Sequence, residues 1–290
     1  MDTEQRMAYP PKTGFRGWLR RRFGRSGPVI PVVRLQGVIA SDQRPGRLNI
    51  SSVAPLLQKA FAGKAPAVAI IVNSPGGSPV QSRLISKRIR DLADEKGKEV
   101  LVFVEDAAAS GGYFIAVAGD EIVADPSSVV GSIGVIYAGF GFPEALEKLG
   151  IERRVYTAGK NKSTLDPFMP AKEEDIARVK DHELDIHKIF IGHVKARRGE
   201  RLKAGDDTLF TGEWWTGVRG LELGLVDALG DMHQVLRERF GPDVRIRPIS
   251  ERRPLFGLPR FGIPGMSAAG LASDALAAIE DRALWSRFGL

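Results

Sequence analysis

Short apolar runs alternate with longer amphipathic stretches along this chain. The apolar runs have the length of β-strands and recur at Val29–Leu35, Val68–Val72, Val100–Val104 and Glu121–Ala124. Between some of them, apolar residues recur every three or four positions, which is typical of a helix that buries one face. Strands that alternate with helices in this way predict an α/β fold.

The clearest predicted helix follows the tight turn NSPGGSP. Its arginines and lysines mostly lie on one face, and the face predicted to be buried consists of Val80, Leu84, Ile85, Ile89, Leu92 and Ala93. A second long helix is expected from Ala171 to about Arg198, because acidic residues open it and basic residues close it, as the helix dipole favours. Its predicted buried stripe is Ile176, Val179, Ile186, Ile189, Phe190 and Val194.

Two further helices are expected towards the C-terminus. Asp231–Phe240 predicts a short helix that ends at Gly241. Ser267–Phe288 predicts an amphipathic terminal helix, which follows the linker Pro254–Gly265, rich in proline and glycine.

Charge is unevenly distributed along the 290 residues. The net charge is +7, and residues 1–28 supply +5 of it because they hold seven Lys/Arg against two acidic residues. The remainder is nearly balanced, so a nucleic-acid binder is disfavoured. With 43% hydrophobic residues, the chain can bury the core of one large domain, and the absence of cysteine excludes disulfides and thiolate catalysis.

The basic N-terminal arm has two interpretations. Its aromatic and aliphatic residues interleave with arginines at roughly helical spacing, so residues 12–25 either contact an anionic membrane surface or form a solvated tail. Prolines and polar residues interrupt the apolar stretch after the arm, which argues against a signal peptide. No segment reaches the roughly 20 apolar residues of a spanning helix. We therefore expect a protein that is cytoplasmic or peripheral to the inner face of the membrane.

Two junctions between a strand and a helix carry the candidate chemistry. One contains Gly76 and Gly77, and the other contains Ser110, Gly111 and Gly112. Glycines let the backbone approach a ligand closely, and the N–H groups of a first helical turn can hold a developing oxyanion. Ser110 stands where a nucleophile is expected, and an N-cap serine is the alternative.

A base for Ser110 must come from elsewhere in the chain. The histidines are His182, His187, His193 and His233, and all fall on helices predicted to be polar-faced surface elements. His182 and His187 are five residues apart, which does not fit the zinc-binding helix pattern, so we expect no metal. A lysine is then the candidate base, and Lys160 and Lys162 are both available.

A lysine base must be neutral at working pH. Burial has to bring its pKa from ~10.4 to roughly 7–8. Ser132 lies between Gly131 and Gly134 near an apolar strand, where its hydroxyl could orient such a lysine.

Four blocks in this order resemble the signal peptide peptidase A family of membrane-linked serine peptidases: NSPGGSPVQS, AAASGGYFIA, DPSSVVGSIGV and AGKNKSTLDPF. A fifth resembles the closing motif of that family and spans Phe210–Gly212, Trp214–Gly217 and Gly224–Asp227. The resemblance covers roughly Val29–Asp231. It implies a ClpP/crotonase-like fold, a spiral of repeated β-β-α units, here with an N-terminal basic arm and a C-terminal amphipathic helix.

The resemblance also implies roles for single residues. Ser110 matches the nucleophile, Lys162 the general base and Ser132 the serine that supports the lysine, while the N–H groups of Gly77 and Gly111 match the oxyanion hole. No cofactor is implied, and Lys160 becomes a control residue. The family's single-unit members form homo-oligomeric rings, and we expect the serine and lysine of one subunit to work together.

These observations predict three regions: an arm at residues 1–28, a peptidase domain at 29–247, and a linker with a terminal helix at 248–290. The leading hypothesis is a Ser-Lys endopeptidase for extended peptides, such as cleaved signal peptides or membrane-derived peptides. The alternative is a non-cutting membrane scaffold or peptide-binding protein on the same fold. A crotonase-like acyl-CoA enzyme is less favoured, because the acidic catalytic residues expected there are not apparent.

Overall fold

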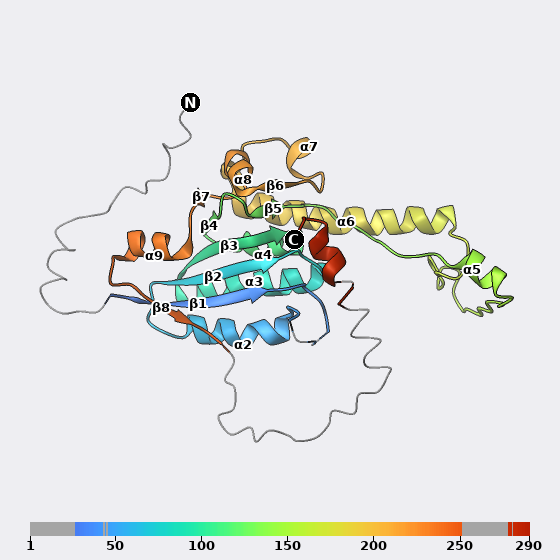
Figure 1. The fold of residues 1–290 in the computed structure, drawn as a ribbon, viewed down its shortest axis with the longest axis horizontal. Helices are drawn as coiled ribbons and strands as arrows, with labels where there is room; N and C mark the ends of the chain where they lie inside the picture. Colours follow the sequence, from blue (N-terminus) through green and yellow to red (C-terminus); the bar gives the residue numbers. More distant parts are fainter. Residues whose placement is uncertain (1–26, 43, 45, 251–277, 280) are drawn as a thin grey trace, which may run out of the picture.

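A computed structural model describes residues 27–42, 44, 46–250, 278–279 and 281–290. Within them, the chain forms a mixed α/β fold around a mostly parallel sheet (Figure 1). The predicted arm at residues 1–28 lies almost entirely outside the described residues, and so do the linker Pro254–Gly265 and most of the predicted helix Ser267–Phe288. Of that helix, residues 278–279 and 281–286 are described and helical.

Each predicted strand is present, and most are longer than predicted. The central ones are β1 (Val29–Gln36), β2 (Ala67–Ser74) and β3 (Glu99–Ala109), followed by β4 (Glu121–Ala124). Shorter strands complete the sheet: β5 (Val129–Gly131), β6 (Trp214–Thr216), β7 (Ala228–Leu229) and β8 (Arg245–Pro248). The order is β6-β5-β3-β2-β1-β8, with β4 pairing β3 and β7 at a branch, and only β5 and β6 are antiparallel.

The extra length of β3 positions the site. Its first half pairs with β4 through Leu101–Val104, and its last three residues pair with β5. Between these two stretches of β3, Glu105 accepts hydrogen bonds from Arg34, and Asn73 Nδ2 donates to Asp106 Oδ2 at 2.6 Å. The register of β2 against β3 shifts at this point. The two acidic residues before the nucleophile junction therefore hold β3 against its neighbours.

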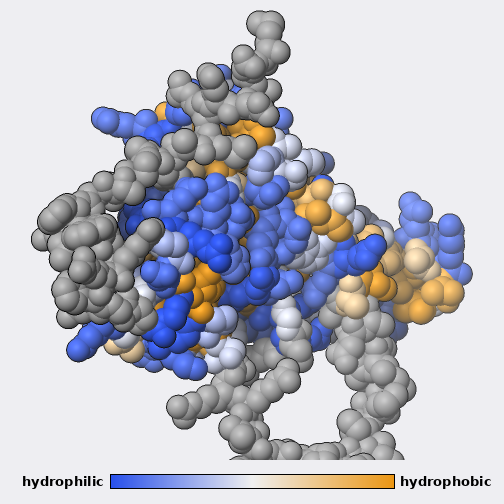
Figure 2. Space-filling view, turned by 60° about the vertical axis from the view of Figure 1, so that its left-hand side comes forward, coloured by the Kyte–Doolittle hydropathy of each residue, from blue (hydrophilic) through white to orange (hydrophobic). Residues whose placement is uncertain are grey.

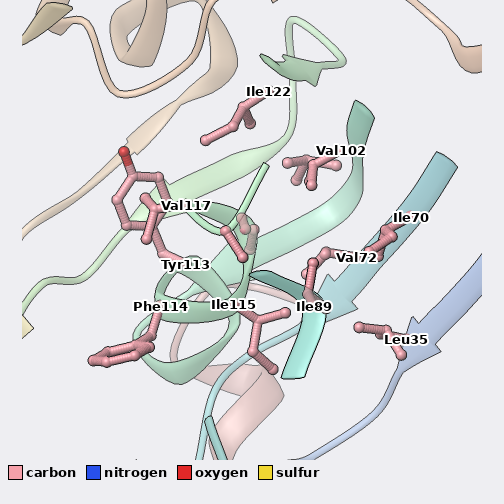
Figure 3. Packing of buried hydrophobic residues seen from close by; sticks show 14 of the residues in the cluster. Leu35, Ile70, Val72, Ile89, Val102, Tyr113, Phe114, Ile115, Val117 and Ile122 are labelled. Atoms are coloured by element: carbon pink, nitrogen blue, oxygen red, sulfur yellow. The ribbon is translucent and has the colours of Figure 1, made fainter. Parts of the chain in front are cut away.

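Helices cover both faces of the sheet. On one face lie α2 (Ile50–Phe61), α3 (Pro79–Lys96) and α4 (Gly111–Ala116), and on the other lies α9 (Met232–Phe240). Figure 3 shows side chains of β1, β2, β3 and α4 packed into one apolar cluster, with the Tyr113 hydroxyl pointing out of it. That hydroxyl donates to Leu225 O at 2.7 Å, so even the polar end of this buried ring is satisfied.

The remaining helices are α5 (Pro143–Lys148), α6 (Glu173–Arg198), α7 (Asp206–Leu209) and α8 (Gly217–Leu223), with a 3-10 turn η1 at Gly199–Arg201. Helix α6 runs out from the body, and the segment around α5 lies at its far end (Figure 1). The predicted stripe of α6 is only partly confirmed, because Phe190 and Val194 are buried but Ile189 is 55% exposed. In α3, Val80 is likewise exposed rather than buried.

Candidate active site

The two glycine junctions meet at the carboxyl ends of β2 and β3. Gly76 has a φ of +104° and Gly77 a φ of +134°. A Cβ on Gly76 would lie 2.8 Å from the Ser110 Cβ, and a Cβ on Gly111 would lie 3.4 Å from Gly77 N. Only glycine allows both the backbone angles and this close approach. The sequence prediction that these junctions act together is consistent with this packing.

The N–H groups of Gly77 and Gly111, at this meeting point, have no acceptor among the described residues. The Gly77 turn is clamped on both sides, because Ile39 N donates to Gly76 O at 2.8 Å and Ser78 N donates to Ile39 O at 2.7 Å. Because the turn is held in place and its N–H is free, little reorganisation is needed when negative charge develops on an oxygen bound there. The pair can therefore bind a carbonyl oxygen or an oxyanion.

Ser110 has a strained backbone, with φ +50° and ψ −120°. Its N–H donates to Gly131 O at 2.8 Å, while its side chain makes no capping hydrogen bond to α4. Ser110 therefore occupies the N-cap position of α4, as the alternative predicts, but its side chain does not cap the helix. A non-glycine residue in such a conformation costs ~1–3 kcal/mol, and serine nucleophiles at sharp turns between strand and helix show this kind of strain. The hydroxyl of Ser110 is left without a partner in the described chain.

Ser132 lies beside this serine through the pairing of β3 with β5, where Ala109 is opposite Gly131. It also has a positive φ, +52°, and it is 8% exposed. Its N–H donates to Glu213 O at 2.7 Å, in the segment just before β6. Two strained serines, Ser110 and Ser132, are thus held on neighbouring turns by backbone hydrogen bonds.

The structure does not bring Lys162 to these serines within one chain. Lys162 and Lys160 both lie on an exposed turn of the segment between β5 and α6. Thr164, two residues after Lys162, accepts a hydrogen bond from Arg178 on α6. Arg178 is nine residues before His187, the α6 residue that bonds Ile133 O. At 1.5 Å per residue, the lysine turn lies ~14 Å further out along α6.

The projecting segment that carries Lys162 also exposes apolar side chains. Figure 2 shows hydrophobic surface gathered at the end of the molecule where this segment projects. Phe142 packs between Phe140 and Phe168, with ring centroids 6.3 and 5.8 Å apart. The exposed large hydrophobic residues of the segment are Ile136, Tyr137, Phe140, Phe142, Leu149, Ile151, Tyr156, Phe168 and Met169. An apolar surface of this extent is typical of a protein interface.

One histidine prediction is wrong, because His193 packs against the nucleophile helix instead of lying on the surface. Its ring stacks on Phe114 with centroids 4.1 Å apart, and Nε2 lies 3.1 Å from both Phe114 O and Ser86 Oγ. Burial lowers the pKa of His193 from 6.5 to about 4. His182 and His233 are exposed, as predicted.

The half-buried His193 predicts an acid-sensitive fold. Neutral His193 is favoured in the folded state, so its contribution is complete above pH 6.5 and is lost as the pH falls towards 4. At ~1.4 kcal/mol per pH unit, the loss is roughly 3 kcal/mol. Urea unfolding at pH 7.5, 5.5 and 4.5 measures it. His193→Gln should flatten the acid slope, whereas His182→Gln, on the exposed face of the same helix, should keep it. Equal slopes in all three proteins would contradict this assignment.

No group of three or more His, Asp or Glu side chains in the described residues could hold a metal ion. No helix in that part of the chain is long and apolar enough to cross a membrane.

The chain is similar to several known proteins. The family model for peptidase family S49 matches residues 93–239. "Putative protease slr0021" of Synechocystis is 33% identical over 69% of this chain and 69% of its own length. A Brucella abortus protein named Na(+)/H(+) antiporter NhaA is 55% identical over 93% of this chain, which spans only 38% of that protein. A mutant of the 1510-N membrane-bound stomatin-specific protease aligns with a TM-score of 0.49 at 16% identity, over 78% of this chain and 99% of that one.

Proposed function

Because the chain belongs to peptidase family S49, a family of serine peptidases, we propose that it is an endopeptidase that cleaves extended peptides with a Ser-Lys dyad. Ser110 is the nucleophile and Lys162 the general base. The observation that carries this proposal is the strained Ser110, with an unpartnered hydroxyl, beside the two free N–H groups of Gly77 and Gly111.

The proposed reaction has two steps. Ser110 Oγ attacks the peptide carbonyl while a neutral Lys162 amine takes its proton, and the N–H groups of Gly77 and Gly111 stabilise the oxyanion. The lysine then protonates the leaving amine, which departs and leaves an acyl-enzyme. Water, deprotonated by the same lysine, hydrolyses the ester and restores Ser110. Ser132 orients the lysine by accepting a hydrogen bond from its amine, which leaves the nitrogen lone pair free to take the proton of Ser110.

The position of Lys162 implies assembly. In the single chain, the lysine is exposed on a projecting apolar segment, whereas a lysine base requires burial to be neutral. We therefore propose a homo-oligomeric ring in which the projecting segment of one copy packs on the next, so that Lys162 of one copy meets Ser110 and Ser132 of its neighbour. This replaces our expectation of a dyad within one subunit.

Three finer features belong to the same proposal. The alternation of strand and helix from β1 to α4, with α6 projecting, supports a ClpP/crotonase-like spiral. The charge of residues 12–25 supports a peripheral contact with an anionic membrane at the inner face, or a cytoplasmic location. Cleaved signal peptides or other membrane-derived peptides are then the natural substrates.

The test is cleavage of an unfolded protein by the purified chain from pH 6 to 10. We expect a rate that rises with pH, and a fluorophosphonate that forms one adduct per chain in the peptide containing Ser110. An assembled, folded protein that neither cleaves nor reacts at any pH would overturn the proposal in favour of a peptide-binding scaffold.

A further inference from the structure

The carboxylate of Asp166 is largely shielded from solvent on a segment that is otherwise mostly exposed. It lies four residues after Lys162, and its side chain is only 8% exposed. The carboxylate accepts three hydrogen bonds, from Phe168 N at 3.0 Å, Arg153 Nη2 at 2.9 Å and Ser163 Oγ at 3.5 Å. Ser163 directly follows Lys162, so Asp166 is linked to the residue adjoining the proposed base.

Arg153 and Phe168 lock this carboxylate in place. The Arg153 guanidinium pairs with Asp166 and also lies 5.5 Å from the centroid of the Phe168 ring. The hydrogen bond from Phe168 N and then the Arg153 pair lower the pKa of Asp166. The side chain therefore stays ionised throughout the pH range in which a lysine base works.

Contacts other than those of Asp166 also hold the turn that carries Lys162 in a defined conformation. Leu165 has a φ of +48°, which a residue with a branched side chain rarely adopts. Phe142 N donates to Pro167 O at 2.6 Å, and Arg178 Nη1 on α6 donates to Asp175 Oδ1 at 2.7 Å and to Thr164 Oγ1 at 3.4 Å. Strain of this kind persists only where the surroundings over-determine it.

We propose that Asp166 is a positioning residue that fixes the turn carrying Lys162, so that an assembled site receives the amine at a defined place. This inference rests on the proposed function. Asp166 is not itself a catalytic residue, because Arg153, Phe168 and Ser163 already occupy its oxygens. It acts through Lys162 by limiting where that side chain can reach.

The test compares Asp166→Asn with Glu152→Gln in the full chain, beside wild type and Lys162→Ala. Glu152→Gln is a matched control, since it removes the same charge from the same segment. Unlike Asp166, Glu152 is 70% exposed and pairs with Arg154, two residues away. Cleavage kinetics are measured from pH 7 to 10, together with thermal unfolding and assembly state.

For Asp166→Asn, we expect kcat at pH 7.5 to fall roughly 10- to 100-fold with little change in KM, because small misplacements of a catalytic group carry losses of that size. The deficit should shrink towards pH 10, because a loosely placed lysine is less buried and needs a higher pH to become neutral. Glu152→Gln should match wild type.

Two results would overturn the inference. One is wild-type kcat and pH profile in Asp166→Asn. The other is a loss that is equal at every pH and proportional to lost assembly, which would mean that Asp166 only stabilises the fold. Lys162→Ala separates this from the proposed function, since full activity in that variant would overturn the dyad itself.

Discussion

Ser110→Ala and Lys162→Ala should each lower cleavage by roughly 10⁴-fold or more, because a nucleophile and its base act as a unit. Neither change should disturb folding, since the Ser110 side chain makes no hydrogen bond within the described chain and Lys162 is exposed. Lys160→Ala is the matched control. It removes the same charge from the same exposed turn and should stay close to wild type.

Mixing the two inactive chains tests where the dyad forms. If Lys162 of one copy serves Ser110 of the next, a co-expressed oligomer of Ser110→Ala and Lys162→Ala chains contains sites with both groups intact. Random assembly of a symmetric ring then restores about a quarter of wild-type activity. Each variant carries a different affinity tag, and two successive affinity purifications isolate the oligomers that contain both variants.

The outcomes separate two parts of the proposal. A mixed oligomer without activity, when both single variants are inactive, would place serine and lysine in the same chain and overturn assembly of the site between copies. Full activity of Lys162→Ala alone would overturn the lysine as base. Recovery of activity would support both parts, because no wild-type chain is present.

Sequence patterns predicted the part of the site that depends on local backbone chemistry. The glycines of the two junctions and the small residues around Ser110 indicate that two backbone segments approach each other closely. In the structure, Gly76 packs against Ser110. The predicted strand ends at Val104, five residues before the end of β3, because polar Glu105 and Asp106 interrupt the apolar run. Their partners, Arg34 and Asn73, are distant in sequence, so no local pattern reveals that the strand continues.

Placement of the lysine could not be predicted in the same way. Helical periodicity indicates which face of α6 is apolar, but not whether this chain or another copy covers it. Ile189 matches the predicted stripe and is nevertheless exposed. His193 was predicted at the surface because its helix was interpreted as a polar-faced surface element, yet its ring packs against Phe114 and hydrogen-bonds Ser86. In both cases the tertiary partner decides burial, and a single sequence does not specify that partner.

The last part of the closing motif, Gly224–Asp227, had no role assigned from the sequence, and the structure gives it a stabilising role. Arg198, at the end of α6, has a side chain only 1% exposed. Its Nη1 donates to Asp227 Oδ2 at 2.7 Å, and its Nε and Nη2 donate to Gly224 O at 3.0 and 2.7 Å. The same motif accepts the Tyr113 hydroxyl at Leu225 O. It therefore joins α6 to the helix that follows Ser110.

Replacing this arginine should be strongly destabilising. Arg198→Met removes both hydrogen bonds to Gly224 O and the nearest cation of Asp227, which keeps Ile122 N and the more distant Arg201. We therefore expect a loss at the lower end of the ~3–5 kcal/mol that breaking a buried pair from one side costs. Equilibrium urea unfolding at pH 7.5 measures the change. Lys188→Met is the control on the same helix, because its pair with Asp185 is exposed and should contribute under ~1 kcal/mol.

A second substitution shows whether the loss comes from the charge of the Asp227 carboxylate. Adding Asp227→Asn to Arg198→Met removes the buried charge while keeping an acceptor for Ile122 N, which donates to Asp227 at 2.7 Å. The double variant should therefore be more stable than the sum of the two single losses predicts. A cost for Arg198→Met close to that of Lys188→Met would show that water reaches the motif, and that α6 is held to the nucleophile helix by apolar packing and His193 instead.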